Sequence, residues 1–143
     1  MNFDVMELID KAMEARMYAY TPYSKFKVGA AILLKNKQYI LGCNVENASY
    51  GLSNCAERTA MFKMISEGYH KEDVIAMAIV GQTDRPISPC GACRQVMSEL
   101  LPENCPIILA NLAREYKEFS LKELLPYSFN EGDLSLIHIS EPT

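Results

Sequence analysis

The sequence predicts an α/β fold in which helices flank one mixed sheet. Residues 74–80 form an apolar run rich in branched side chains, residues 91–101 have a helical pattern, and residues 107–110 form a second apolar run. This order is a βαβ unit, whose two strands run parallel with a right-handed crossover. Earlier in the chain, the apolar runs 27–34 and 39–45 are separated by a short polar turn, which is typical of an antiparallel hairpin. A sheet that contains both units is mixed.

The other elements follow from local patterns. Asp4 and Glu7 form a capping pair for a first amphipathic helix, whose apolar residues recur at every fourth position, at Val5, Ile9, Met13 and Met17. A second helix is expected over residues 55–67, because Gly68 is a favoured residue just beyond a helix end. Residues 115–126 are expected to hold a last short strand and a helical turn.

Composition limits the class of protein. The chain has 143 residues, 49% of them hydrophobic, which fits one soluble domain with a single core. The net charge of -4 argues against nucleic acid as a partner, because phosphate binding needs a basic surface. The longest apolar stretch, residues 28–34, is far shorter than the ~20 residues of a membrane-spanning helix, and the acidic N-terminus does not resemble a secretory signal. A cytoplasmic location is therefore expected, with no membrane contact.

Three of the five cysteines have the spacing of metal ligands. Cys55 begins one predicted helix, and Cys90 and Cys93 lie at the start of another, so two helix N-termini can converge on one ion. Zinc binds thiolates readily, and a catalytic zinc site keeps three protein ligands and an open fourth position for water. We therefore predict one Zn²⁺ per subunit. The remaining cysteines, Cys43 and Cys105, lie in or beside predicted strands and are expected to be buried, inert thiols.

Two charged residues follow the first cysteine. Glu57 is the candidate catalytic residue, because a carboxylate beside a metal-bound water can remove and return a proton. Arg58 is the candidate for a residue that hydrogen-bonds a ligand thiolate and offsets the negative charge of three sulfurs. The alternatives are a first-turn glutamate favoured by the helix dipole and a solvated surface arginine. A purely structural zinc module is a further alternative, and it requires a fourth ligand such as Cys43 or Cys105.

The zinc motif resembles that of the zinc nucleoside deaminases, with Cys55-Ala56-Glu57 followed by Pro89-Cys90-Gly91-Ala92-Cys93. The likeness extends to residues 23–31 and 44–50, which are similar to small, homotetrameric cytidine deaminases. The resemblance implies a three-layer αβα fold around a mixed five-stranded sheet. It implies hydrolytic deamination of cytidine and deoxycytidine to uridine and deoxyuridine in pyrimidine salvage, by zinc-bound hydroxide with Glu57 as proton shuttle. A related aminopyrimidine nucleoside is the alternative substrate.

The resemblance also implies substrate contacts. Asn44 and Glu46 are expected to hold the ribose hydroxyls and Phe26 to pack against the pyrimidine ring, and the full set of expected substrate-binding residues is Phe26, Asn44, Val45, Glu46, Ala56, Tyr50 and Phe129. Of these, Tyr50 and Phe129 resemble residues that reach the pocket of a neighbouring subunit, so a homotetramer with shared sites is expected. The alternative is that both aromatic rings fill the core of their own chain or its subunit contacts.

The sequence departs from the resemblance in two places. Nucleic-acid-editing relatives use histidine as the first zinc ligand, whereas Cys55 occupies that position here, which favours a free nucleoside as substrate. Residues 135–143 match nothing in the family pattern. We therefore expect one catalytic domain over residues 1–134, followed by a tail that is not native to it.

Overall fold

The computed structural model describes residues 2–125 of the chain. Its elements occur in an order that confirms the predicted α/β class: α1 (Val5–Arg16), β1 (Val28–Leu34), β2 (Tyr39–Cys43), η1 (Tyr50–Leu52), α2 (Ala56–Ser66), η2 (Lys71–Asp73), β3 (Val74–Gly81), α3 (Gly91–Leu100), β4 (Pro106–Asn111), β5 (Tyr116–Ser120) and α4 (Leu121–Leu124). The two short 3₁₀ turns, η1 and η2, have no counterpart in the sequence prediction.

The strands form one five-stranded sheet in the order β2-β1-β3-β4-β5. The strand β1 pairs antiparallel with both β2 and β3, whereas β3 and β4 are parallel and are joined through α3. The predicted hairpin and the predicted βαβ unit are both present, and β5 adds an antiparallel edge strand to β4. The sheet is mixed, as expected.

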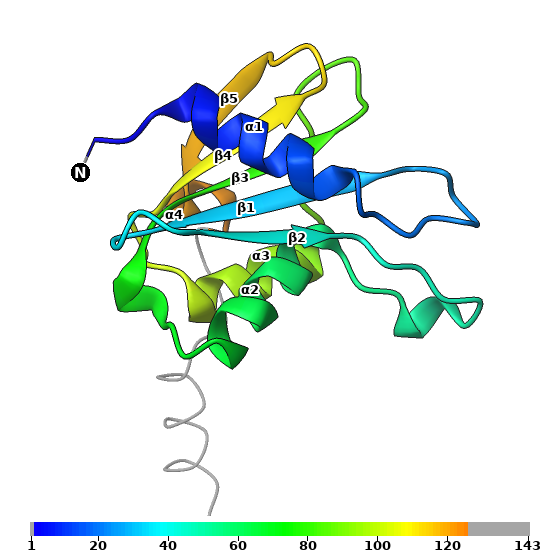
Figure 1. Ribbon diagram of the computed structural model, residues 1–143, viewed down its shortest axis with the longest axis horizontal. Coiled ribbons are helices and arrows are strands. Elements are labelled where there is room, and N and C mark those ends of the chain that lie inside the picture. The colour runs from blue at the N-terminus through cyan, green and yellow to red at the C-terminus, as the bar shows by residue number, and fades with distance from the viewer. Residues whose placement is uncertain (1, 126–143) are drawn as a thin grey trace, which may run out of the picture.

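Helices cover both faces of this sheet, so the molecule has three layers (Figure 1). On one face α1 packs over small side chains such as Ala31, Ala76 and Ala78. On the other face α2 and α3 pack over larger ones, among them Ile32 and Met77. The strand β3 lies in the interior of the sheet and contributes to both cores, which explains why its run of apolar residues is continuous rather than alternating.

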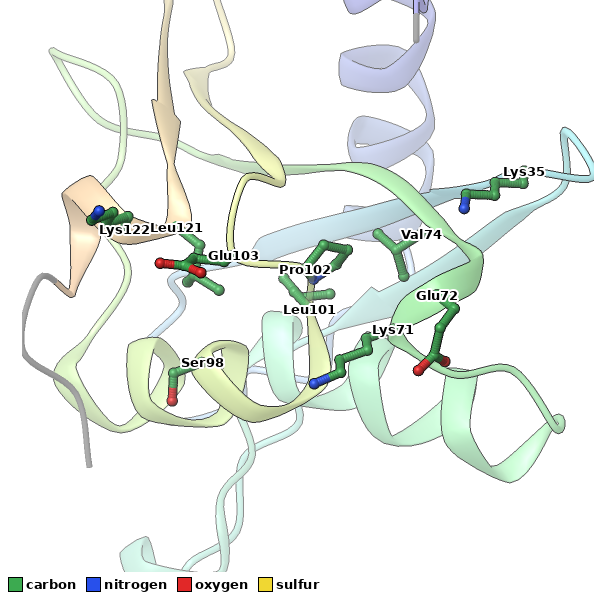
Figure 2. A pocket seen from close by; sticks show the side chains of 10 residues that line it. All are labelled: Lys35, Lys71, Glu72, Val74, Ser98, Leu101, Pro102, Glu103, Leu121 and Lys122. Atoms are coloured by element: carbon green, nitrogen blue, oxygen red, sulfur yellow. The ribbon is translucent and has the colours of Figure 1, made fainter. Parts of the chain in front are cut away.

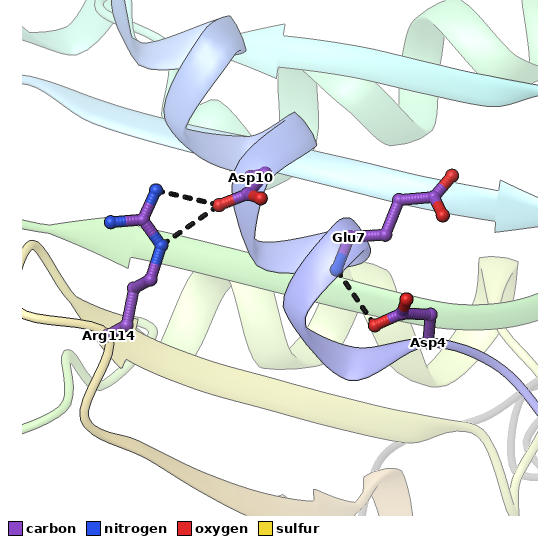
Figure 3. A network of polar contacts seen from close by, with 4 residues as sticks. All are labelled: Asp4, Glu7, Asp10 and Arg114. Atoms are coloured by element: carbon purple, nitrogen blue, oxygen red, sulfur yellow. Dashed lines mark hydrogen bonds and ion pairs between the residues drawn. The ribbon is translucent and has the colours of Figure 1, made fainter.

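Polar contacts fix the start of α1 and anchor the middle of the helix (Figure 3). The Asp4 carboxylate caps the helix by accepting a hydrogen bond from the backbone N–H of Glu7 at 3.1 Å, so the predicted cap is confirmed. Arg114, in the turn between β4 and β5, donates from Nε and Nη2 to Asp10 Oδ1 at 2.9 and 2.7 Å. This ion pair ties the middle of α1 to the turn between β4 and β5.

The residues of α1 that face the core are not the set predicted to recur at every fourth position. The buried residues are Leu8, Ile9, Ala12 and Ala15, whereas Met17 is 73% exposed and lies beyond the helix end. Steps of four residues advance about 400° around a helix with 3.6 residues per turn, so such a stripe rotates away from the core.

Two glycines allow the helices to approach the sheet closely. A Cβ at Gly29 of β1 would lie 1.9 Å from the carbonyl oxygen of Ala12 in α1. A Cβ at Gly42 of β2 would lie 2.4 Å from the backbone nitrogen of Ala60 in α2. Backbone atoms cannot move aside as the end of a side chain can, so these positions exclude any larger residue.

The antiparallel pairing brings the start of β1 and the ends of β2 and β3 to the same end of the sheet. In the register, Val28 at the start of β1 pairs with Gly81 at the end of β3, and Gly29 pairs with Cys43 at the end of β2. The connections that lead into α2 and α3 leave from this end of the sheet. The candidate site residues therefore gather there although they are distant in the sequence.

A cavity of about 660 Å³ lies near the opposite end of the sheet, where β1 ends and β3 begins (Figure 2). Its lining includes Val74 at the start of β3 and Leu121 at the start of α4, together with exposed lysines and glutamates. Within the described part of the chain, the one group of three or more potential metal ligands lies elsewhere, at the cysteines. Over residues 2–125, no helix is both long and apolar enough to cross a membrane.

Candidate metal centre and active site

The structure brings the three predicted cysteines together. Cys55 is the N-cap of α2, Cys90 is the N-cap of α3, and Cys93 lies in the first turn of α3. The Sγ atoms of Cys55 and Cys90 are 3.9 Å apart, those of Cys90 and Cys93 are 3.2 Å apart, and all three lie within 4.8 Å of one another. The predicted convergence of two helix N-termini is confirmed.

These sulfur positions fit a zinc ion. A Zn–S bond of about 2.3 Å in tetrahedral geometry places two sulfurs about 3.8 Å apart. The separation of Cys55 and Cys90 meets this value, and the 3.2 Å between Cys90 and Cys93 is shorter than it. Three soft ligands of one element type are a donor set that zinc prefers over harder cations.

Positive groups surround the first sulfur. The N–H groups of α2 and α3 point their dipoles toward the cluster, and Arg58 Nη2 donates to Cys55 Sγ at 3.2 Å. A hydrogen bond from Cys93 and then the contact with Arg58 lower the pKa of Cys55 to about 5, against the opposing effect of burial. The pKa of Cys93 is raised, first by its hydrogen bond with Cys55 and then by burial. Of this hydrogen-bonded pair, Cys55 is thus the thiol that ionises more readily.

Glu57 is buried beside the cluster, with 5% of its surface exposed. Burial is the main cause that raises the pKa of its carboxyl group, and the charge of Cys55 adds to this effect. A hydrogen bond between its side chain and Cys93 acts in the opposite direction. A carboxyl group with a raised pKa next to a metal can both accept and donate a proton near neutral pH.

The other two cysteines do not join the cluster. Cys105 is buried, its thiol lies 3.6 Å from the carbonyl oxygen of Pro106, and burial raises its pKa to about 12. Cys43 ends β2 and is half-buried, and burial raises its pKa as well. Among the residues that the structure describes, no fourth cysteine, histidine or carboxylate completes the group. The structural-zinc alternative therefore has no fourth ligand in this part of the chain.

A cavity of about 490 Å³ opens next to the first zinc ligand. Four of the residues expected to bind substrate line it together with the metal ligand and the arginine, and these are Phe26, Asn44, Glu46, Tyr50, Cys55 and Arg58. Ala56 is fully buried at the start of α2, and Val45 is half-exposed, with its backbone bonded to Asn54. Phe129 and the tail 135–143 lie outside the described residues.

Backbone contacts already engage two of the cavity residues. Asn44 accepts a hydrogen bond from the Val28 N–H at 2.9 Å and donates to the Phe26 carbonyl oxygen at 2.8 Å. Glu46 Oε1 accepts from the N–H groups of Tyr23 and Ser24 at 3.0 and 3.1 Å. Because both residues hold the loop that carries Phe26, they shape the cavity as well as line it.

Sequence reasoning missed two residues that support this cavity. The hydroxyl of Ser24 donates to Glu46 Oε2 and accepts from the Phe26 N–H at 3.0 Å, so it links two expected substrate-binding residues. A Cβ at Gly81 would lie 3.3 Å from Phe26 Cζ, so this glycine leaves room for the ring. Both lie in or beside segments singled out from the sequence, but their contacts depend on tertiary structure.

Fold and site together define an α/β protein with a three-cysteine zinc centre, one ligand of which, Cys55, lines an adjacent cavity. Residues 4–109 match the family described as the cytidine and deoxycytidylate deaminase zinc-binding region. Because that match covers well over half of the chain, the protein belongs to this family of zinc-dependent deaminases. Cys55, Cys90 and Cys93 are its zinc ligands.

Close relatives agree with this membership. The chain is 53% identical to a cytidine deaminase of Halalkalibacterium halodurans over 92% of this chain and 98% of the relative. It is 47% identical to a cytidine deaminase of Sporosarcina psychrophila over 92% and 96%. The crystal structure of cytidine deaminase from Burkholderia pseudomallei superposes with a TM-score of 0.86 at 49% identity, covering 89% of this chain and all of that one. The predicted three-layer fold with a five-stranded sheet is confirmed.

Proposed function

We propose that the protein hydrolyses the exocyclic amine of cytidine and deoxycytidine, giving uridine or deoxyuridine and ammonia, as a step of pyrimidine salvage. The observation that carries this proposal is that Cys55 lines the same 490 Å³ cavity as Phe26, Asn44 and Glu46. A metal ligand thus shares a nucleoside-sized cavity with an aromatic ring, an amide and a carboxylate. Relatives that match nearly the whole chain carry the name cytidine deaminase.

Glu57 moves the protons in this proposal. Cys55, Cys90 and Cys93 would hold the zinc, which would supply the Lewis acidity that activates the attacking water. The Glu57 carboxylate accepts a proton from that water, delivers it to ring N3 of the pyrimidine, and mediates a second transfer to the departing amine. Its burial and raised pKa support this role, because raising the pKa of a carboxyl group makes it a better proton acceptor and brings it closer to the pH at which it can also donate.

The proposed ribose contacts use the hydrogen-bonding capacity that the fold leaves over. Asn44 still has one amide N–H beyond the one given to the Phe26 carbonyl oxygen. Glu46 Oε2 accepts the Ser24 hydroxyl, and a carboxylate oxygen has a second lone pair that can accept a hydrogen bond from a sugar hydroxyl. Val45 and Ala56 contribute backbone groups near the sugar and base, and the Phe26 ring packs on the pyrimidine. A related aminopyrimidine nucleoside would meet the same groups.

We propose a homotetramer in which neighbouring subunits complete each site. Tyr50 lines the cavity yet is 90% exposed, so it does not fill the core of its own chain. A cavity of about 520 Å³ between α2 and α3 is lined largely by apolar side chains, including Phe62, Ile65, Val96 and Leu100. Apolar surfaces of this kind are typical of subunit contacts. Phe129 is the proposed contribution of a neighbouring subunit. Light scattering on the purified protein measures the mass directly, and a monomer at micromolar concentration refutes this part.

The proposal places the enzyme in the cytoplasm and restricts it to free nucleosides rather than nucleic acid. A reducing compartment keeps five thiols free, and all five are unpaired in the structure. We further propose that residues 1–134 form the whole catalytic domain. Deletion of residues 135–143 should leave kcat and KM unchanged, and loss of activity on this deletion refutes that proposal.

An ultraviolet assay of the zinc-loaded protein tests the reaction and the substrate class together. We expect loss of the cytosine chromophore with cytidine and deoxycytidine, and no reaction with free cytosine or adenosine. Turnover of free cytosine at a similar rate contradicts the ribose contacts of Asn44 and Glu46. Absence of turnover with every cytosine nucleoside, in protein that holds one zinc per subunit, refutes the proposed function.

A further inference from the structure

One guanidinium lies at the junction of three segments near the zinc site. Arg94, in the first half of α3, donates from Nε to the carbonyl oxygen of Pro89 at 3.1 Å. Its Nη2 donates to Ser88 Oγ at 2.8 Å, and its Nη1 donates to the carbonyl oxygen of Leu124 at 2.9 Å. Every nitrogen of the side chain thus has an acceptor on a segment that lacks regular structure or ends a helix.

These bonds fix the backbone on both sides of Cys90. The backbone N–H of Arg94 donates to the Cys90 carbonyl oxygen at 3.0 Å, while its side chain holds the Pro89 carbonyl oxygen, which belongs to the preceding peptide group. The two peptide groups that flank the Cys90 Cα are therefore bonded to one residue. Because φ and ψ of Cys90 set the direction of its Cα–Cβ bond, this anchoring sets where Sγ points.

The other hydrogen bonds to this loop lie at its start, where the Asn111 amide donates to the Asp84 carbonyl oxygen at 3.3 Å and the Thr83 hydroxyl donates to the Arg85 carbonyl oxygen. Within the described part of the chain, no backbone-to-backbone hydrogen bond fixes residues 84–89. Cys90 itself is exposed, whereas Cys93 is buried and Cys55 is half-buried, so packing contributes least to this one of the three zinc ligands. The position of Cys90 therefore depends on hydrogen bonds. Arg94 supplies three of those on residues 88–90, and the Cys93 N–H adds one to Cys90 Sγ at 3.4 Å.

The third bond connects the same loop to the last described helix. Leu124 ends α4, and its carbonyl oxygen has no partner within a helix of four residues. Arg94 satisfies that oxygen. A planar guanidinium can reach acceptors in three directions at once, whereas a lysine ammonium on a flexible stem cannot hold all three in fixed geometry.

We propose that Arg94 is a positioning residue that holds Cys90 in the orientation needed to bind zinc, and that it thereby slows the release of the metal. Arg94 does not touch the metal in this proposal. It acts through the Pro89 and Cys90 peptide groups, with Ser88 in a supporting role. The proposal rests on the zinc site, but it does not depend on which nucleoside the enzyme deaminates.

The test measures zinc release from the loaded protein into an excess of a coloured chelator such as 4-(2-pyridylazo)resorcinol. We expect the Arg94→Ala variant to release zinc at least about tenfold faster than the unaltered protein, the range typical of residues that support metal ligands. Arg94→Lys should lie in between, and Ser88→Ala, which removes one of three acceptors, should have a smaller effect. Arg16→Ala is the matched control, because Arg16 also donates to a backbone carbonyl, that of Lys27, but belongs to α1, which covers the face of the sheet opposite the helices that carry the zinc ligands.

Global destabilisation must be separated from this local effect. The Leu8→Ala variant removes a fully buried side chain on the opposite face of the sheet and serves as a stability control. Equal zinc release from Leu8→Ala and Arg94→Ala at the same loss of Tm overturns the proposal, as does release from Arg94→Ala at the rate of Arg16→Ala. If Arg94→Ala fails to fold, the graded effects of Arg94→Lys and Ser88→Ala decide. Faster release in protein that lacks activity on cytidine supports Arg94 while refuting the proposed function.

Discussion

The Nη2 atom of Arg58 lies 3.2 Å from the Sγ atom of Cys55, the cysteine that begins the same helix. Three thiolates on Zn²⁺ leave a net charge of -1, which weakens the metal as an acid. The guanidinium offsets this charge, so Arg58→Ala should lower kcat by about 10- to 100-fold and raise the apparent Kd for zinc. Steady-state kinetics and a zinc titration check both effects. Lys63→Ala, which removes an exposed cation from the same helix, should change neither.

Replacement of the buried carboxylate tests the proton shuttle. Glu57→Gln keeps the shape of the side chain but removes its ability to exchange a proton, so kcat should fall by about 10²- to 10⁴-fold. Zinc content should stay at one ion per chain, because Glu57 is not one of the three ligands. Metal analysis and stopped-flow assays measure the two quantities. Glu67→Gln, at the end of the same helix, is the control, and near-normal turnover by Glu57→Gln ends the shuttle mechanism.

The hydroxyl of Ser24 controls the ionisation of Glu46. Hydrogen bonds from the Ser24 side chain and then from its backbone lower the pKa of Glu46 below its usual value. A lowered carboxyl pKa means that the loop contacts are stabilised at neutral pH, and that this stabilisation is lost as the pH falls through the folded-state pKa.

Ser24→Ala should therefore shift this loss to higher pH, nearer the usual glutamate value of about 4.3. The backbone N–H groups of Tyr23 and Ser24 both donate to Glu46, so their NMR shifts should report its titration. An unchanged titration midpoint in Ser24→Ala would show that the hydroxyl has no influence. The experiment needs no substrate, so it is independent of the proposed ribose contact.

A methyl group at position 81 should disturb the ring of Phe26. In Gly81→Ala, Cβ would lie 2.5 Å from Ile87 Cδ1 and 3.3 Å from Phe26 Cζ. Both contacts involve ends of side chains, so the variant should fold with a loss of about 1–3 kcal/mol of unfolding free energy and with a raised KM for cytidine. Ile87→Val deletes the nearer atom. The double variant should recover most of the lost Tm, and failure to do so would place the strain elsewhere.

The sequence allowed the prediction of most of the fold because its signals are local. Residues close together in the sequence are enough to predict three features. These are the apolar runs of β1 and β3, the turn between β1 and β2, and the cysteines at two helix starts. The second strand ends at Cys43 rather than residue 45. Beyond Cys43 the Asn44 backbone N–H still donates to the Val28 carbonyl oxygen at 3.3 Å, and the Asn44 side chain adds bonds to Val28 and Phe26, which no pattern of hydrophobicity predicts.

The supporting residues of the site were not predictable in the same way. Arg94 follows Cys93 directly and reads as an ordinary polar residue in a helix, because its partner Leu124 is distant in the sequence. Ser24 and Gly81 likewise act across the fold rather than along it. The zinc ligands and Glu57 carry chemistry that identifies them, whereas a residue that only orients another becomes visible in the tertiary structure.

The position of β3 has a consequence for how the protein matures. This strand separates Cys55 from Cys90 in the sequence and lies in the sheet interior, between β1 and β4. A nascent chain that has not yet passed residue 90 offers a single thiol of the three, and the others join it once β3 has paired antiparallel with β1, a non-local contact that forms slowly. Metal uptake is therefore a late event, and the arrival of zinc marks a chain whose strands have already found their neighbours.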